Sequence, residues 1–149
     1  MPRRPAAHHF TSSPDEVEAE FYEALNHADL ERMMSCWADE DDMVCVHPGG
    51  QRLVGEASIR AAFEALFSNG AVTVQASEMR RVESLTSAVH SVVELIQVQT
   101  PDGPRQATVL ATNVYQKTPQ GWRMVAHHAS PGAVLESAPT PSSISKTLH

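Results

Sequence analysis

The clearest indication of this chain's fold lies in residues 111–131, which read ATNVYQKTPQGWRMVAHHASP. Two strand-like segments flank the turn sequence TPQG, and a link this short allows only an antiparallel hairpin. Polar side chains occupy positions where a sheet normally buries apolar ones. Asn113, Tyr115, His127 and His128 can donate, accept or shuttle protons, so they are the first candidates for a functional site.

The strand-like pattern extends upstream of this hairpin. Short links interrupt it, including Pro101–Gly103 with the proline that follows, and they again permit only antiparallel pairing. Four long strands are therefore predicted, at about residues 71–83, 87–100, 105–117 and 121–130.

The first half of the chain has helical spacing instead. Ser13 followed by Pro14 and Glu16 is typical of a helix N-terminus, and Asp29 can cap a second helix. Helices are expected from residue 14, from residue 30 and from residue 56, with a short strand at residues 43–47. Helices first and a meander last indicate an α+β domain, whose three helices pack on one face of a curved antiparallel sheet.

This domain is expected to span residues 13–132, between extended tails at residues 1–12 and 133–149 that are rich in Pro, Ser, Ala and Thr. The other face of the sheet is not properly polar. Val89 and Val93 point toward it, because they alternate with residues of the same strand that point toward the helices. An apolar face needs a cover. We therefore predict a homodimer through the face that the helices leave bare.

Composition excludes several classes of protein. The 149 residues are 42% hydrophobic and 19% charged, which is ordinary for one globular domain. A net charge of -7 argues against a nucleic-acid partner. No apolar run approaches the length of a membrane span, and no secretory signal is recognisable, so a cytoplasmic location is expected. Cys36 and Cys45 fit that compartment as free, mostly buried thiols.

Three segments carry a resemblance to a known family: VCVHPGG at residues 44–50, LVGEASIRAAFEALF at residues 53–67, and the stretch at residues 111–131. In this order they resemble the SnoaL-like branch of the nuclear transport factor 2 (NTF2)-like superfamily. The resemblance implies a cone in which helices and a curved sheet enclose a pocket. Its members include ketosteroid isomerase, scytalone dehydratase, limonene epoxide hydrolase, polyketide cyclases and non-catalytic transport and oligomerisation modules, so no single activity is implied.

Strand parity predicts which side chains face that pocket. In the last strand Trp122, Met124 and His128 share one face, and Arg123 and His127 share the other. The face with Trp122 and Met124 is the more apolar and should be concave. We therefore expect His128 in the pocket and His127 toward the dimer face or solvent, an assignment that a β-bulge would reverse.

Glu94 is the second catalytic candidate, because it shares a face with Val92 and Ile96. Desolvation in a half-apolar cavity would raise its pKa toward the range useful for a general base. Glu94 and His128 on neighbouring strands would form an acid/base couple. The alternative is a structural hydrogen bond that fixes the histidine ring.

Five residues are candidates for ligand contact: Trp37, His47, Phe63, Asn113 and Tyr115. The alternatives for these side chains are core packing, backbone hydrogen bonding, or a wetted hydroxyl. Only His47, Glu94 and His128 could converge as metal ligands, and we assign no metal and no cofactor.

Two functions remain open. One is a cofactor-free isomerase, dehydratase or cyclase that binds a small, mostly apolar carbonyl compound and transfers protons through His128 and Glu94. The other is a non-catalytic ligand-binding or oligomerisation module.

Overall fold

The structure is a computed structural model, and it describes residues 13–132. The predicted tails at residues 1–12 and 133–149 lie outside the described residues. In chain order the elements are α1 (Pro14–His27), α2 (Leu30–Ser35), β1 (Val44–Val46), β2 (Arg52–Val54), α3 (Glu56–Phe67), β3 (Val74–Glu83), β4 (Ser87–Thr100), β5 (Gly103–Thr118) and β6 (Gly121–Pro131).

Local sequence explains where the first two helices begin. The Ser13 hydroxyl accepts the backbone N–H of Glu16, and Pro14 occupies the first turn of α1, as predicted. The Asp29 carboxylate accepts the backbone N–H of Arg32 at the start of α2. The Ser13 cap thus fixes where α1 begins, and the Asp29 cap fixes where α2 begins.

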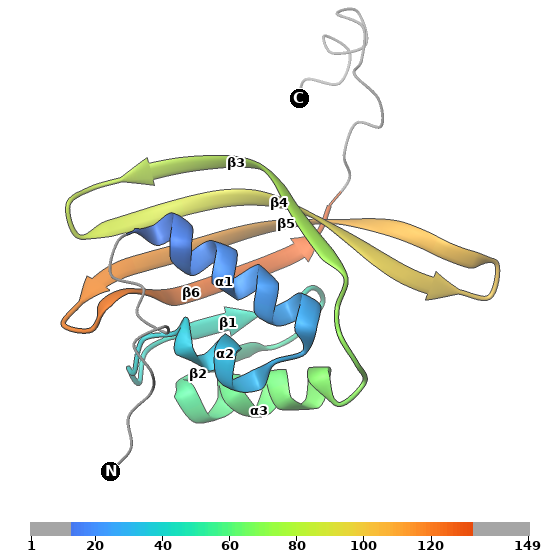
Figure 1. Cartoon of the computed structure of the whole chain (residues 1–149), viewed down its shortest axis with the longest axis horizontal. Helices are drawn as coiled ribbons and strands as arrows, with labels where there is room; N and C mark the ends of the chain where they lie inside the picture. The colour runs from blue at the N-terminus through green and yellow to red at the C-terminus, as the bar shows by residue number, and fades with distance from the viewer. Residues whose placement is uncertain (1–12, 133–149) are drawn as a thin grey trace, which may run out of the picture.

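The strands form one six-stranded sheet in the order β2-β1-β6-β5-β4-β3 (Figure 1). The four long strands form the predicted antiparallel meander. The short strand β1, however, runs parallel to β6, so the expectation of a purely antiparallel sheet is corrected at this pair. No tight turn joins β1 to β6, so hairpin geometry does not constrain their relative direction. Strand β2, which was not predicted, pairs with β1 across the Pro48–Gly50 turn.

The helices lie on one side of the curved sheet, with α1 crossing the long strands and α3 beside β1 and β2 (Figure 1). The core lies between the helices and the inner face of the sheet. Its largest fully buried side chains include Phe21, Met33, Phe63, Tyr115 and Met124. The domain is therefore an α+β fold with one helical layer, as predicted.

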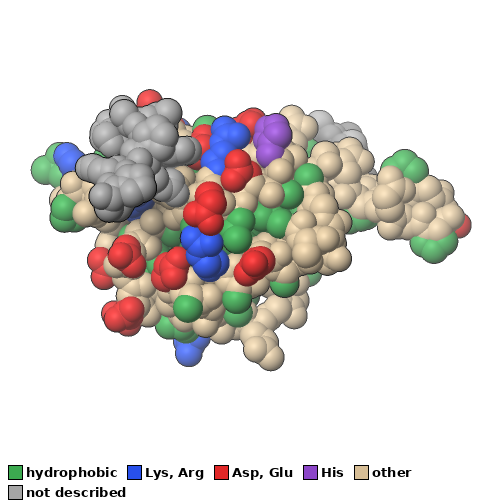
Figure 2. Space-filling view, turned by 60° about the horizontal axis from the view of Figure 1, so that its bottom comes forward, with side chains coloured by type: hydrophobic (Ala, Val, Ile, Leu, Met, Phe, Trp, Pro, Cys, Tyr) green, Lys and Arg blue, Asp and Glu red, His purple; other side chains and the backbone are tan. Residues whose placement is uncertain are grey.

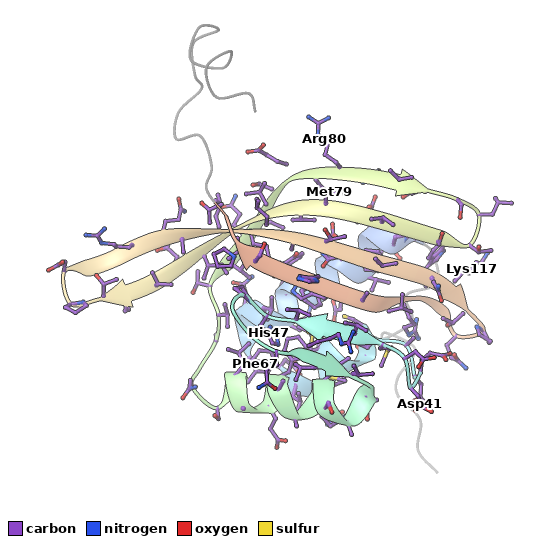
Figure 3. The ribbon with its side chains drawn as sticks, turned by 180° about the vertical axis from the view of Figure 1, so that it is seen from behind. Asp41, His47, Phe67, Met79, Arg80 and Lys117 are labelled. Atoms are coloured by element: carbon purple, nitrogen blue, oxygen red, sulfur yellow. The ribbon has the colours of Figure 1, made fainter. Side chains whose placement is uncertain are left out.

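The opposite side of the long strands, which we call the outer face, has no helix over it in the described part of the chain. Figure 3, seen from behind, shows the sheet in front of α1, with no other element of residues 13–132 over it. Apolar side chains on this face are open to solvent: Val82 is 75% exposed, Leu110 43% and Val89 39%. The expectation of an uncovered apolar face is confirmed, whereas the predicted homodimer stays a prediction.

The helical side carries mainly acidic charge. Figure 2 shows acidic side chains gathered around a few basic ones. Ion pairs join Arg32 to Glu20 and Arg60 to Glu31. Among the described side chains that Figure 2 shows, the basic ones do not gather into a patch that could follow a phosphate backbone. Among the described residues, no helix is long and apolar enough to cross a bilayer.

Candidate functional site

Polar side chains are buried between α1 and the inner face of the sheet, and hydrogen bonds connect them. We call this set the buried polar network. It consists of Glu18 and Tyr22 from α1, His90 and Glu94 from β4, Asn113 and Tyr115 from β5, and His127 from β6. Buried polar groups are costly without partners, so this many in one core calls for a reason.

The spacing of residues along each helix and strand explains why the side chains of this network face inward. Glu18 and Tyr22 are four residues apart on α1, so both lie on the face that also buries Phe21 and Leu25. On the strands, alternation brings every second side chain inward. This parity buries His90 and Glu94 on β4, as it does Asn113 and Tyr115 on β5.

Glu18 is the acceptor at one end of the network. Its Oε2 accepts hydrogen bonds from His90 Nδ1 at 2.9 Å, Tyr115 OH at 2.8 Å and Asn113 Nδ2 at 3.2 Å. Burial by itself would raise the pKa of Glu18, but these donors and the nearby imidazole outweigh it and lower that pKa. Glu18 is therefore a buried carboxylate. Because a carboxylate only accepts, His90 carries its proton on Nδ1.

The pKa of Glu94 is shifted in the opposite direction. Tyr22 OH donates to Glu94 Oε2 at 2.7 Å. Burial raises the pKa of Glu94, the hydrogen bond from Tyr22 offsets part of the rise, and the charge of Glu18 adds to it. The pKa of Tyr22 is raised by burial and by the Glu94 charge, so its phenol stays protonated. The expected upward shift of the Glu94 pKa is thus found, with desolvation as its main cause.

Asn113 joins these two carboxylates to a histidine. Its Nδ2 donates to Glu18 and, at 3.1 Å, to Tyr22 OH. Its Oδ1 accepts a 2.6 Å hydrogen bond from His127 Nδ1. With both amide donors used, Oδ1 can only accept, so the His127 proton lies on Nδ1 and Nε2 keeps its lone pair. Burial, aided by the nearby His47 and His128, lowers the pKa of His127 to about 3.

The assignment of the two adjacent histidines is the main correction. His127 is buried, whereas His128 is exposed on the outer face, so the placement of His128 in the interior is wrong. The cause is a bulge in β6. Val114 lies opposite Ala126 but Tyr115 lies opposite Met124, which leaves Val125 as the extra residue. Downstream of it the inward parity changes from even to odd residue numbers.

Of the predicted ligand contacts, Asn113 and His47 lie beside His127, whereas Tyr115 lies against His90. The rings of His47 and Phe63 have centroids 5.1 Å apart, and the His47 ring is 6.3 Å from that of His127. His47 is half-buried near the end of β1, where Figure 3 labels it, and burial lowers its pKa. Trp37 and Phe63 are both buried, with ring centroids 6.4 Å apart. Whether these residues contact a ligand stays a prediction.

Cys45 and His47 lie closer than strand spacing suggests, with Sγ 3.8 Å from Nε2. Burial raises the pKa of the Cys45 thiol to about 12, and it lowers the pKa of His47. Both shifts favour the neutral pair over a thiolate and an imidazolium, so this contact is not an activated nucleophile. Cys36 and Cys45 are free and buried, as predicted.

Two buried side-chain nitrogens lack a hydrogen-bond partner within residues 13–132: Trp37 Nε1 and His90 Nε2. Unpartnered buried donors and acceptors are rare in folded proteins, and they often mark sites. The trio of His47, Glu94 and His128 does not converge, because His128 faces outward.

Sequence reasoning does not select Glu18, Tyr22 or His90 as site residues. His90 has the same parity as Glu94 on one strand, so the argument that placed Glu94 inside also places His90 there. Glu18 and Tyr22 are spaced by one helical turn beside the apolar stripe of α1. Their partners come from strands 72 to 97 residues away along the chain, and no local pattern reports such pairing.

Comparisons with known proteins agree with this fold. A SnoaL-like domain model matches residues 15–134. A structure from Thiobacillus denitrificans, provisionally described as a calcium/calmodulin-dependent protein kinase type II association domain, is 33% identical; the match covers 83% of this chain and 98% of that one, with a TM-score of 0.74. A structure from Streptomyces avermitilis, provisionally described as a dehydratase of the NTF2-like family, is 26% identical over 80% of this chain and 94% of that one, with a TM-score of 0.71.

The same fold occurs in the hub of calcium/calmodulin-dependent protein kinase II from S. rosetta, which is 20% identical, with 89% of this chain and 100% of that one covered and a TM-score of 0.65. Among curated proteins, none matches this chain. The resemblance seen in the sequence is confirmed, and the chain belongs to the SnoaL-like domain family, with an NTF2-like fold.

Proposed function

We propose that the protein is a cofactor-free acid/base enzyme that moves a proton within a small, mostly apolar carbonyl compound. The observation that carries this proposal is the Glu94 carboxyl, which is buried, has a raised pKa and is held by one phenol, Tyr22. A carboxyl group with a raised pKa can both take and return a proton near neutral pH. The NTF2-like relative that is provisionally described as a dehydratase supports the same class of reaction.

The chemistry assigns one role to each group. Glu94 takes a proton from the carbon beside the carbonyl and returns it to another carbon, so atoms and charge balance without a cofactor. Trp37 Nε1–H, a buried donor without a partner, is the candidate to bind the substrate oxygen. His127 Nε2, whose tautomer Asn113 fixes, accepts a hydrogen bond from a substrate hydroxyl. In this proposal His127 has the role that strand parity predicted for His128.

A panel of small β,γ-unsaturated cyclic ketones tests the reaction. Isomerisation to the conjugated ketone is followed by absorbance, and uptake of deuterium from D₂O by NMR. We expect Glu94→Gln to lower the rate by at least about 100-fold, the range of general acid–base catalysis. His128→Asn, on the outer face of β6, is the control and should leave the rate unchanged. An unimpaired Glu94→Gln variant, or a panel that neither reacts nor binds, would reject the proposal.

The second candidate is an assembly module, in which two copies pack through the outer face. Exposed Val82, Val89 and Leu110 favour it, because an uncovered apolar face is typical of an interface. The 33% identical structure provisionally described as an association domain supports it as well. Sedimentation of the full chain tests this candidate: a monomer at micromolar concentration would exclude it.

For location we infer the cytoplasm. The support is the unpaired state of Cys36 and Cys45, which suits a reducing compartment. Fractionation of cells that express the full chain with its own termini tests this inference.

A further inference from the structure

One cluster of metal-ligating side chains lies outside the proposed site, where the first turn of α1 meets the ends of β3 and β4. His90 Nε2 is 3.8 Å from Asp15 Oδ1 and 3.9 Å from Glu83 Oε2. All three ligand atoms lie within 4.8 Å of one another. Asp15 and Glu83 are exposed, so the cluster opens to solvent on its acidic side.

The buried His90 distinguishes this cluster from a group of exposed acidic residues. The ring is 0% exposed, and its Nδ1–H is committed to Glu18. Nε2 has no hydrogen-bond partner and is directed at two carboxylates, which only accept; in the neutral ring, whose one proton is on Nδ1, Nε2 offers a lone pair to a metal. Two carboxylates that face one buried imidazole nitrogen favour a cation among them, and a metal ion can take that place.

We propose that Asp15, Glu83 and His90 form a binding site for one divalent transition-metal ion, for which Zn²⁺ is the probe. An imidazole nitrogen with two carboxylate oxygens is a common zinc donor set, and water can complete the coordination. Ligands at zinc-bonding distance in a tetrahedral site are about 3.4 Å apart. The distances of 3.8 and 3.9 Å need only a small inward movement of two half-exposed carboxylates.

Glu18 supplies the outer shell of this site. Metal-bound histidines commonly donate their other ring N–H to a carboxylate, which fixes the tautomer and raises the basicity of the ligating nitrogen. The 2.9 Å contact from His90 Nδ1 to Glu18 Oε2 has this arrangement. The metal would then lie at the rim of the buried polar network, on the far side of Glu18 from Glu94.

Arg81 is the competing cation. Its Nη2 donates to both Asp15 oxygens at 2.9 and 3.0 Å, and its Nε lies 3.8 Å from Glu83 Oε2. Guanidinium and metal therefore compete for the same carboxylates, and removal of the guanidinium should tighten metal binding. If the cluster were only a surface ion-pair network, with a protonated His90, the loss of Arg81 would create no affinity for a metal.

Calorimetric titration of the full chain with Zn²⁺ tests the proposal. His8 and His9, which lie outside the described residues, are replaced by Gln in every variant to remove a histidine pair that could bind zinc by itself. We expect one saturable site per chain. Asp15→Asn or Glu83→Gln should weaken it at least tenfold, and Arg81→Gln should strengthen it. Both acidic residues are exposed, so neither substitution threatens folding.

Glu23→Gln is the matched control, because Glu23 lies 3.4 Å from the exposed His27 on the same helix and should not matter. A second readout is the ¹⁵N resonance of His90 Nε2, which should move on zinc addition. The proposal is overturned if no saturable binding occurs, if Asp15→Asn and Glu83→Gln leave the affinity within twofold, or if the His90 resonance does not respond to zinc.

Discussion

The two faces of the long strands differ in the kind of side chain that is out of its usual environment. The inner face buries charged and polar groups, and each carboxylate there accepts at least one hydrogen bond. The outer face leaves apolar Val82 and Leu110 in solvent. The inner face therefore keeps costly groups that a stable core does not need, and the outer face keeps surface that a monomer does not need. These two departures are the observations behind the two proposals, a ligand site on the inner face and an interface with a second copy on the outer face.

The largest contrast between the faces should appear at adjacent positions of β5. Asn113→Leu removes the amide that bridges Glu18, Tyr22 and His127, and it leaves the His127 donor unsatisfied. We expect a loss of about 3 kcal/mol in the free energy of unfolding. Thr112→Ala on the outer face should change it by less than about 0.5 kcal/mol. Urea denaturation measures both, and equal losses would show that the network is not a stabilising unit.

The pH dependence of stability should distinguish the two adjacent histidines of β6, one on each face. The pKa of His127 is lowered from 6.5 to about 3, so the fold favours the neutral ring. Its contribution to stability is complete above pH 6.5 and is lost as the pH falls toward 3. The loss amounts to about 2 kcal/mol at pH 5.

His127→Asn keeps a donor for Asn113 and removes this titration, so the stability of that variant should fall less between pH 7 and pH 5 than that of the wild type. His128→Asn is the comparison: burial is the main cause of the lowered His127 pKa and His128 the smallest one, so the curve of this variant should stay close to that of the wild type. Thermal unfolding across this pH range decides between them. Parallel curves for His127→Asn and the wild type would mean that the ring does not titrate as a buried base.

These two histidines also show how far sequence reasoning reaches. The helices, the meander and the inward position of Glu94 follow from period, caps and short links, which are local properties. The bulge at Val125 is not local: it is an extra residue relative to a partner strand, and parity fails from that point on. Parity alone therefore predicts His128 as the inward residue, whereas His127 is the buried one. The parallel pairing of β1 with β6 was missed for a similar reason, since no turn sequence encodes it.

A smaller, opposite pH effect is expected at Glu94. Its pKa in the folded protein is raised above 4.5, so its contribution to stability is present below pH 4.5 and is lost as the pH rises through the folded value. Glu94→Gln keeps an acceptor for Tyr22 OH and removes the charge. The variant should therefore gain melting temperature relative to the wild type as the pH rises. Glu64→Gln, exposed on α3, should show no such trend, and a flat difference for Glu94→Gln would contradict the raised pKa.

The smallest effect on folding is expected where the outer face is most open to a second copy. Leu110 is 43% exposed, so Leu110→Lys removes little burial and should change the stability of the single chain by less than about 1 kcal/mol. In a dimer through this face, however, the same lysine would bury a charge in an apolar interface, and association should be lost. Sedimentation should then show a dimeric wild type and a monomeric variant with the same circular dichroism. A variant that stays dimeric would move the interface elsewhere and leave the exposure of this face without a role in assembly.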